Sequence, residues 1–153
     1  MGVPADALSD AETRALCRLA GFMVPASAEH GMPGADDAVI AADIVRSLDR
    51  DLGDVRVALA RLHAIAGGDF TALGPTAAAA AATALLEGGG PSITALGRAV
   101  LQCYYRDDRV LRALGLEARA PYPLGRTVPA GDWSLLDPVR GRPRLWRDVD
   151  GAR

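Results

Sequence analysis

Apolar residues recur every three or four positions along most of the chain, with polar residues between them. This spacing is typical of helices that bury one face. The clearest stripe is formed by Ile40, Ile44, Leu48 and Leu52, each four residues after the last. No segment shows the strict alternation of a half-buried strand. The pattern therefore predicts an all-α domain, a small bundle of about five to six helices over residues 9–115.

Capping residues, prolines and glycines mark the expected helix boundaries. Ser9 and Glu12 have the spacing of a capping box at the start of the first helix, which is expected to end before Pro25. The second predicted helix carries the stripe described above and runs to Gly53. The later helices are each expected to begin at an acidic residue or a proline. The predicted starts after the first helix are Asp36 or Asp37, Asp54, Pro75, Pro91 and Asp107.

Residues 116–153 are predicted to form a long irregular arm that is rich in Pro and Arg. Five prolines in these 38 residues interrupt any helical or strand period. The arm also holds many large apolar side chains, which are costly to leave in water at about 25 cal/mol per Å² of apolar area. Two placements follow: the arm packs along its own bundle, or it lies on a partner.

The aromatic residues suggest where a partner would bind. Both tryptophans and all three tyrosines lie between Arg98 and Trp146. Trp, Tyr and Arg dominate the energetics of many protein interfaces. We therefore predict a partner-binding surface in and next to the arm. Its residues are Tyr104, Tyr105, Arg106, Tyr122, Trp133, Leu135, Leu136, Arg140, Arg142, Arg144 and Trp146.

Composition narrows the kinds of partner. Half of the 153 residues are hydrophobic and 24% are charged, so a folded domain is expected. A net charge of −2 gives no reason to expect nucleic acid or an anionic membrane. All 17 basic residues are Arg, which suits either a GC-rich genome or bidentate contacts at an interface. Residues 1–8 lack a basic start, a twin arginine and a long apolar run, which predicts no signal peptide, no membrane span and a cytoplasmic location.

No catalytic or cofactor-binding constellation is predicted in the chain. His63 is expected to be a partly buried structural residue, and His30 lacks a second metal ligand of the right kind. The glycines of 88–91 follow a helix and have no Lys of a phosphate-binding loop. Asp107 and Asp108 look like paired carboxylates, but a helix start explains them through capping. We therefore expect no catalytic residue, no metal and no bound cofactor.

Four features occur in an order and spacing that resemble one known family. They are Leu8-Ser9 to Val24-Pro25, a Gly/Pro loop before an Asp-capped helix, Phe70-x-x-Leu73-x-Pro75 before the Leu85-Leu86 helix, and Tyr104-Tyr105-x-Asp107 followed by Leu114-Gly115. Together they resemble the gluconate 2-dehydrogenase subunit 3 family. The resemblance implies a small helical, non-catalytic subunit of a hetero-oligomer. Its partner would be a large oxidoreductase of the glucose-methanol-choline type, which holds FAD and oxidises an alcohol or sugar. Many members of the family carry a twin-arginine export signal, and this sequence departs from them.

Two functions are therefore expected as alternatives. In the first, the chain is an accessory subunit whose arm lies on the flavoprotein and stabilises it. In the second, it is an independent small helical enzyme or ligand-binding bundle. The pocket of the second would be lined by Tyr104, Tyr105 and His63.

Overall fold

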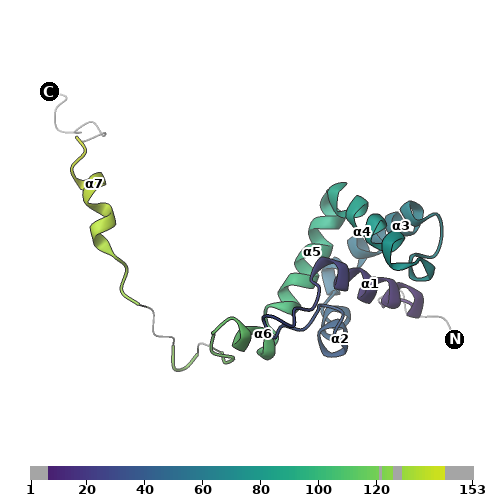
Figure 1. Cartoon of the computed structure of the whole chain (residues 1–153), viewed down its shortest axis with the longest axis horizontal. Helices are drawn as coiled ribbons and strands as arrows, with labels where there is room; N and C mark the ends of the chain where they lie inside the picture. Colours follow the sequence, from purple (N-terminus) through teal and green to yellow (C-terminus); the bar gives the residue numbers. More distant parts are fainter. Residues whose placement is uncertain (1–6, 121, 126–128, 144–153) are drawn as a thin grey trace. The chain divides into compact units, whose positions relative to one another are not determined.

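The structure, a computed structural model, describes residues 7–120, 122–125 and 129–143. These residues form helices, turns and one isolated bridge between Ser27 and Met32, with no strand among them. The all-α fold is confirmed. The chain divides into two compact units, Met1–Arg119 and Ala120–Arg153 (Figure 1).

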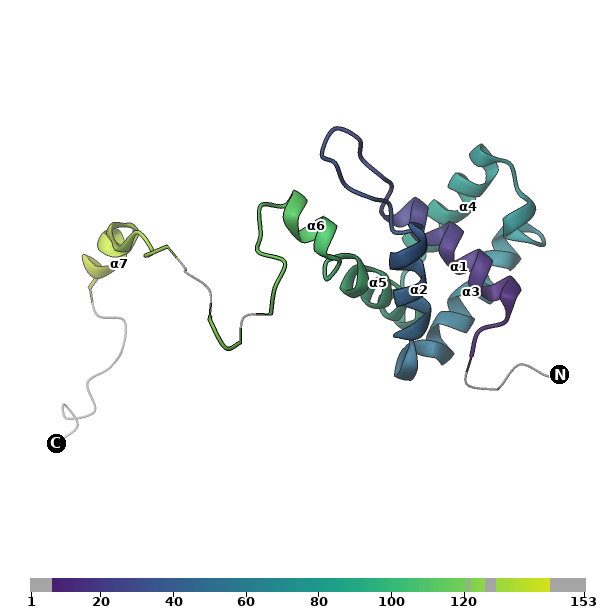
Figure 2. The same cartoon turned by 90° about the horizontal axis from the view of Figure 1, so that it is seen from below.

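The first unit is the helical bundle. Its described elements are α1 (Asp10–Met23), α2 (Ala38–Arg46), η1 (Asp49–Asp51), α3 (Leu52–Ala66), η2 (Phe70–Ala72), α4 (Pro75–Glu87), α5 (Pro91–Tyr104) and α6 (Asp108–Ala113), where η denotes a 3-10 helix. Helix α3 is central because it packs against α1, α4 and α5, while α2 packs against α1 and α5. Figure 2 shows α6 following from the end of α5, and the loop between α1 and α2 extending away from the helices.

One apolar core joins the helices of this unit. Phe70 is its largest fully buried side chain, although it lies in η2 rather than in a long helix. The stripes predicted from the sequence face this core. The largest fully buried side chains from the helices are Leu16, Leu19, Ile40, Ile44, Val55, Leu59, Leu62, Leu85, Leu96, Val100 and Val110.

The predicted helix starts are confirmed at three caps. The Ser9 hydroxyl accepts a hydrogen bond from the Glu12 N–H at 3.2 Å, and the Ser9 N–H donates to the Glu12 carboxylate at 2.7 Å. Asp37 caps α2 by accepting from the first backbone N–H groups of that helix. Asp107 caps α6 in the same way. Helices α4 and α5 begin at prolines, as expected, because proline suits the first helical position.

The predicted end of the second helix was wrong. Helix α2 ends at Arg46 rather than at Gly53, and η1 separates it from α3. Asp49 takes a positive φ of 34°, which interrupts the α-helical path. Leu48 is nevertheless buried, at 2% exposed, so the apolar spacing continues through the turn without a continuous helix. Asp54 consequently lies in the first turn of α3 instead of capping it.

The second unit contains a short helical segment that the sequence reading did not predict. Its elements are η3 (Trp133–Leu136) and α7 (Asp137–Arg140). The Asp132 carboxylate starts the segment by accepting from the Ser134 N–H at 3.0 Å. Every described residue from Ala120 onward is exposed. The described part of the arm therefore has no core of its own.

Candidate functional site

The arm presents its large apolar side chains to solvent. Tyr122 is 87% exposed, Leu135 75%, Trp133 67% and Leu136 41%. Such side chains normally become buried against something, because water is an unfavourable environment for them. These four residues of the predicted partner-binding set are therefore available for contact.

Of the three predicted arginines of the arm, Arg140 and Arg142 lie among the described residues. Arg140 donates to the Asp137 carboxylate at 3.1 Å within α7, and its side chain stays 62% exposed. Arg142 is also exposed. Arg144 and Trp146, which belong to the predicted set, lie outside the described residues.

Tyr104 is a core residue, so its predicted place on a partner-binding surface is wrong. Its side chain is 2% exposed, and its hydroxyl donates to the Pro33 carbonyl oxygen at 3.0 Å. Burial raises the pKa of the Tyr104 phenol. Tyr105, by contrast, is 53% exposed and meets the Tyr104 ring edge-on, with centroids 5.2 Å apart. Tyr104 faces the core because it continues the apolar stripe of α5, whereas the next residue points outward.

Arg106 is engaged within the helical unit. Its Nε donates to Asp43 Oδ2 at 2.6 Å, and its Nη2 donates to Ser47 Oγ at 2.5 Å. These bonds tie the end of α5 to α2. The guanidinium is still half-exposed, so a partner could reach only the part not facing Asp43.

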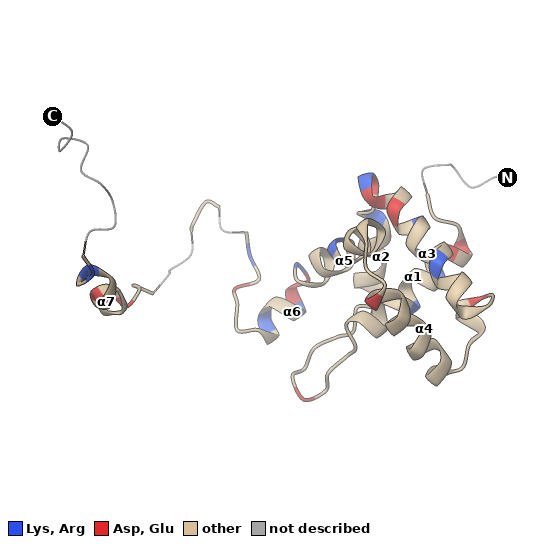
Figure 3. Ribbon diagram, turned by 90° about the horizontal axis from the view of Figure 1, so that it is seen from above, with Lys and Arg blue, Asp and Glu red and all other residues tan. Residues whose placement is uncertain are grey.

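Arg109 joins the caps of two helices. Its guanidinium forms a bidentate pair with Asp37, with nitrogen–oxygen distances of 2.7 and 3.1 Å, and bonds Asp107 at 2.9 Å. The hydrogen bond from Arg109 lowers the pKa of Asp37 to about 2, and the N–H groups of α2 add to this effect. Figure 3 shows acidic and basic residues close together on α6, in contrast to α4, which is drawn almost entirely in tan. The sequence predicted the two capping carboxylates but not the arginine that links them.

His63 is a structural residue, as its sequence context predicted. Its Nδ1 accepts from the Phe70 N–H at 3.2 Å and lies 3.0 Å from the Gly68 carbonyl oxygen. His63 thus bonds to the start of η2, whereas Tyr104 bonds to the loop between α1 and α2. The pocket of the alternative function stays a prediction.

Arg18 is a structural anchor that sequence reasoning missed. Its guanidinium donates to the carbonyl oxygens of Phe70, Thr71 and Leu73 at 2.6 to 2.9 Å. It also lies over the Phe70 ring, 5.2 Å from the centroid. These contacts hold η2 against α1. Because these partners lie more than 50 residues later in the sequence, no local motif predicts the contacts.

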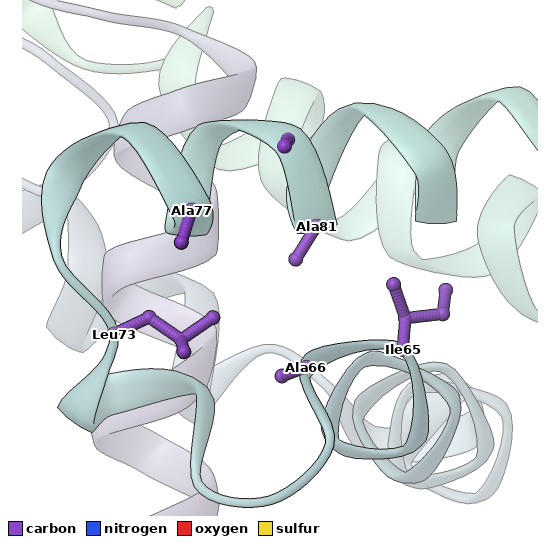
Figure 4. Close-up of a pocket in the computed structure, with 6 residues that line it drawn as sticks. Ile65, Ala66, Leu73, Ala77 and Ala81 are labelled. Carbon is purple, nitrogen blue, oxygen red and sulfur yellow. The ribbon is translucent and has the colours of Figure 1, made fainter.

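One surface hollow lies between the end of α3 and α4 (Figure 4). It has a volume of about 320 Å³ and is lined only by apolar side chains. Its residues are Ile65, Ala66, Leu73, Ala77, Ala80 and Ala81. None of these lining residues has a polar side chain that could orient a ligand.

Two further hollows lie beside Asp36, the residue before the cap of α2. One is formed with α1 and α2, and the other with the end of α1 and Pro75. Gly21, inside α1, leaves the space that the Asp36 side chain occupies. A glycine inside a helix costs about 1 kcal/mol relative to alanine. Asp36 therefore lies close to α1, although the residue itself is exposed.

The part of the chain that the structure describes holds no group of three or more His, Cys, Asp or Glu residues that could bind a metal ion. Within the same residues, no helix is both long and apolar enough to cross a membrane. Comparisons with protein-family models, with curated proteins and with solved structures found no match to this chain.

Proposed function

We propose that the chain is the non-catalytic small subunit of a hetero-oligomer. Its large subunit would be an FAD-dependent oxidoreductase of the glucose-methanol-choline type, acting on an alcohol or sugar. The proposal rests on the family resemblance and on one structural observation. That observation is the exposure of every described residue from Ala120 onward.

The exposed apolar area of the arm favours a large protein as its partner. A Trp side chain buries about 150 to 250 Å² when covered. Since Trp133 is 67% exposed, covering it would remove roughly 130 Å² from water, equivalent to about 3 kcal/mol at 25 cal/mol per Å². Tyr122 and Leu135 add further exposed apolar area that a partner could cover. An extended segment with such residues at intervals suits a broad surface, because binding must also offset the cost of ordering and association.

The arginines of the arm suit the rim of such an interface. A guanidinium pairs with carboxylates in a planar, bidentate geometry. Arg142 is exposed, and Arg140 shares only one bond with Asp137. The proposed roles are therefore aromatic anchoring by Trp133 and charge pairing by the arginines. The cytoplasmic location stays a prediction.

Co-purification from the native host tests the proposal. A tagged full-length chain is expected to bring down a large protein with flavin absorbance, whereas the chain expressed alone should carry no flavin. Deletion of residues 121–153 should abolish co-purification while the far-UV helical signal persists. Stoichiometric flavin in the isolated chain would refute the accessory-subunit role.

Single substitutions locate the contact. Trp133→Ala is expected to weaken the complex by about 2 kcal/mol or more, as central aromatic anchors do. Val57→Ala is the matched control, because Val57 is 53% exposed but lies on α3. If the truncated chain holds the flavoprotein at full affinity, the interface lies on the helices instead. If the truncated chain unfolds, the arm belongs to the core of the bundle.

A further inference from the structure

The helical segment formed by η3 and α7 is held by contacts between near neighbours in the sequence. The Asp132 carboxylate caps its start by accepting from the Ser134 N–H at 3.0 Å and from the Ser134 hydroxyl at 2.6 Å. Pro138 lies in the first turn of α7, where its fixed φ suits a helix. At the other end, the Gly141 N–H donates to the Asp137 carbonyl oxygen at 3.0 Å. These contacts by themselves favour a helical form of the segment.

The segment is amphipathic. A 3-10 helix turns by about 120° per residue and an α-helix by about 100°. Counted in this way over residues 133–140, the large apolar side chains fall within an arc of about 120°. They are Trp133, Leu135, Leu136 and Val139. All four are between 41 and 75% exposed. Ser134 and Asp137 fall outside the arc, so one side of the segment is apolar and the other polar.

The width of this arc determines the shape of the surface that can cover it. A flat surface meets a helix along one narrow line, whereas side chains spread over about 120° need walls on both sides. No charged side chain of residues 133–140 lies within the arc, so the covering surface must also be apolar, because a buried charge without a partner is costly. Arg140, paired with Asp137 at 3.1 Å, lies just outside the arc and would stay at the rim. A surface that fits this face is therefore an apolar groove.

We propose that the large subunit receives this segment as a helix in an apolar groove, with Trp133, Leu136 and Val139 as the anchors. Helices that bind in grooves place their anchors three or four residues apart, and these three recur at every third position. The inference rests on the proposed function, because it states how the flavoprotein binds the arm. It adds Val139 to the interface and gives Asp132 a positioning role, since the cap keeps the helix formed without touching the partner.

Two valines of equal exposure test the face. Val139 is 54% exposed, and Val57 on α3 is 53% exposed. In binding titrations of the full-length chain with the co-purified flavoprotein, Val139→Ala should raise the Kd about fivefold, because it removes apolar contact from the groove. Val57→Ala should leave the Kd unchanged. Equal affinities of the two variants would overturn the inference.

The cap tests the helical form. Asp132→Ala should weaken the complex about fivefold, whereas Asp132→Asn should keep the wild-type affinity, because Asn caps a helix as well as Asp. Equal losses in both variants would assign Asp132 to a direct charge contact and overturn its positioning role. In the isolated full-length chain, the ¹³Cα shifts of residues 133–140 should lie partway toward helical values, since so short a helix is marginal in water. Asp132→Ala should reduce that displacement, and random-coil shifts in the wild-type chain would overturn the inference.

The outcomes separate this inference from the proposed function. If a flavoprotein binds the wild-type chain and the Val139→Ala variant equally, the accessory role stands and the groove does not. If the protein that co-purifies carries no flavin, or if none co-purifies, the proposed function fails and this inference fails with it. Shifts of residues 133–140 that change on concentrating the chain alone would assign the face to a second copy, and would also overturn the inference.

Discussion

The pair between Arg109 and Asp37 should stabilise the bundle measurably, and Asp37→Asn isolates its contribution. Asn is as good a helix cap as Asp, so this substitution keeps the start of α2 and removes only the charge. Asp37→Ala removes both. The difference between the two variants therefore separates the cap, worth about 1 kcal/mol, from the ion pair.

The magnitude follows from the pKa of Asp37. Its fall from 3.8 to about 2 corresponds to about 2.4 kcal/mol at most, at about 1.4 kcal/mol per pKa unit. The Asp37 side chain is 28% exposed and that of Arg109 43%, so solvent screens the pair. After this discount we expect Asp37→Asn to lower the free energy of unfolding by about 1 kcal/mol.

The pH dependence gives the sign of the effect. The folded-state pKa lies below the unfolded value, so the contribution is present in full above about pH 4 and is lost as the pH falls through about 2. Urea denaturation followed by circular dichroism should thus show a difference between wild type and Asp37→Asn at pH 7 that shrinks toward zero near pH 2. Asp108→Asn is the control, since the exposed pair of Asp108 with Arg112 should contribute at most about 0.5 kcal/mol. A constant difference down to pH 2, or equal losses in the two variants, would refute the reasoning.

Three further substitutions test the core and the arm. Leu48→Ala should lower the free energy of unfolding by about 2 to 5 kcal/mol in urea denaturation, because Leu48 is 2% exposed. Arg46→Ala, at an exposed residue, should change it by no more than about 0.5 kcal/mol, and equal losses would contradict the burial of Leu48. Tyr104→Phe should lower the free energy of unfolding by about 1 kcal/mol by leaving the Pro33 carbonyl without its donor, and an unchanged value would show that water replaces it. Trp133→Ala should leave the melting temperature of the isolated chain nearly unchanged, because Trp133 is 67% exposed; a large loss would place it in the core.

Local signals in the sequence were sufficient for the start of every helix of the bundle except α3. Ser9, Asp37 and Asp107 act on backbone groups two or three residues away, so their roles can be read from neighbouring residues. The end of α2 could not be found in this way. Leu48 and Leu52 keep four-residue spacing across η1, and periodicity alone does not distinguish a continuous helix from a turn that returns to the same core.

Contacts distant in sequence were the other source of error. Tyr104 looks like an interface residue by type, but it is buried and its hydroxyl bonds to Pro33, 71 residues earlier. Arg106 likewise bonds to Asp43, although it stays half-exposed and its place on a partner-binding surface stays a prediction. The need for Gly21 also becomes clear only when Asp36 lies beside α1. These relations depend on how α5 and the α1–α2 loop pack, which residue types do not reveal.

The central position of α3 has a consequence for how the bundle opens. Neighbours on α1, α4 and α5 cover this helix, whereas α6 lies at the end of the unit and consists of six residues. A local opening that releases α6 would leave the contacts of α3 with α1, α4 and α5 in place. The amides around Leu59 and Leu62 should therefore exchange their hydrogens only when the whole unit unfolds, so their slowest exchange rates would report its global stability. Amides of the exposed arm should exchange their hydrogens far faster, so the two units should differ clearly in amide exchange rate within one chain.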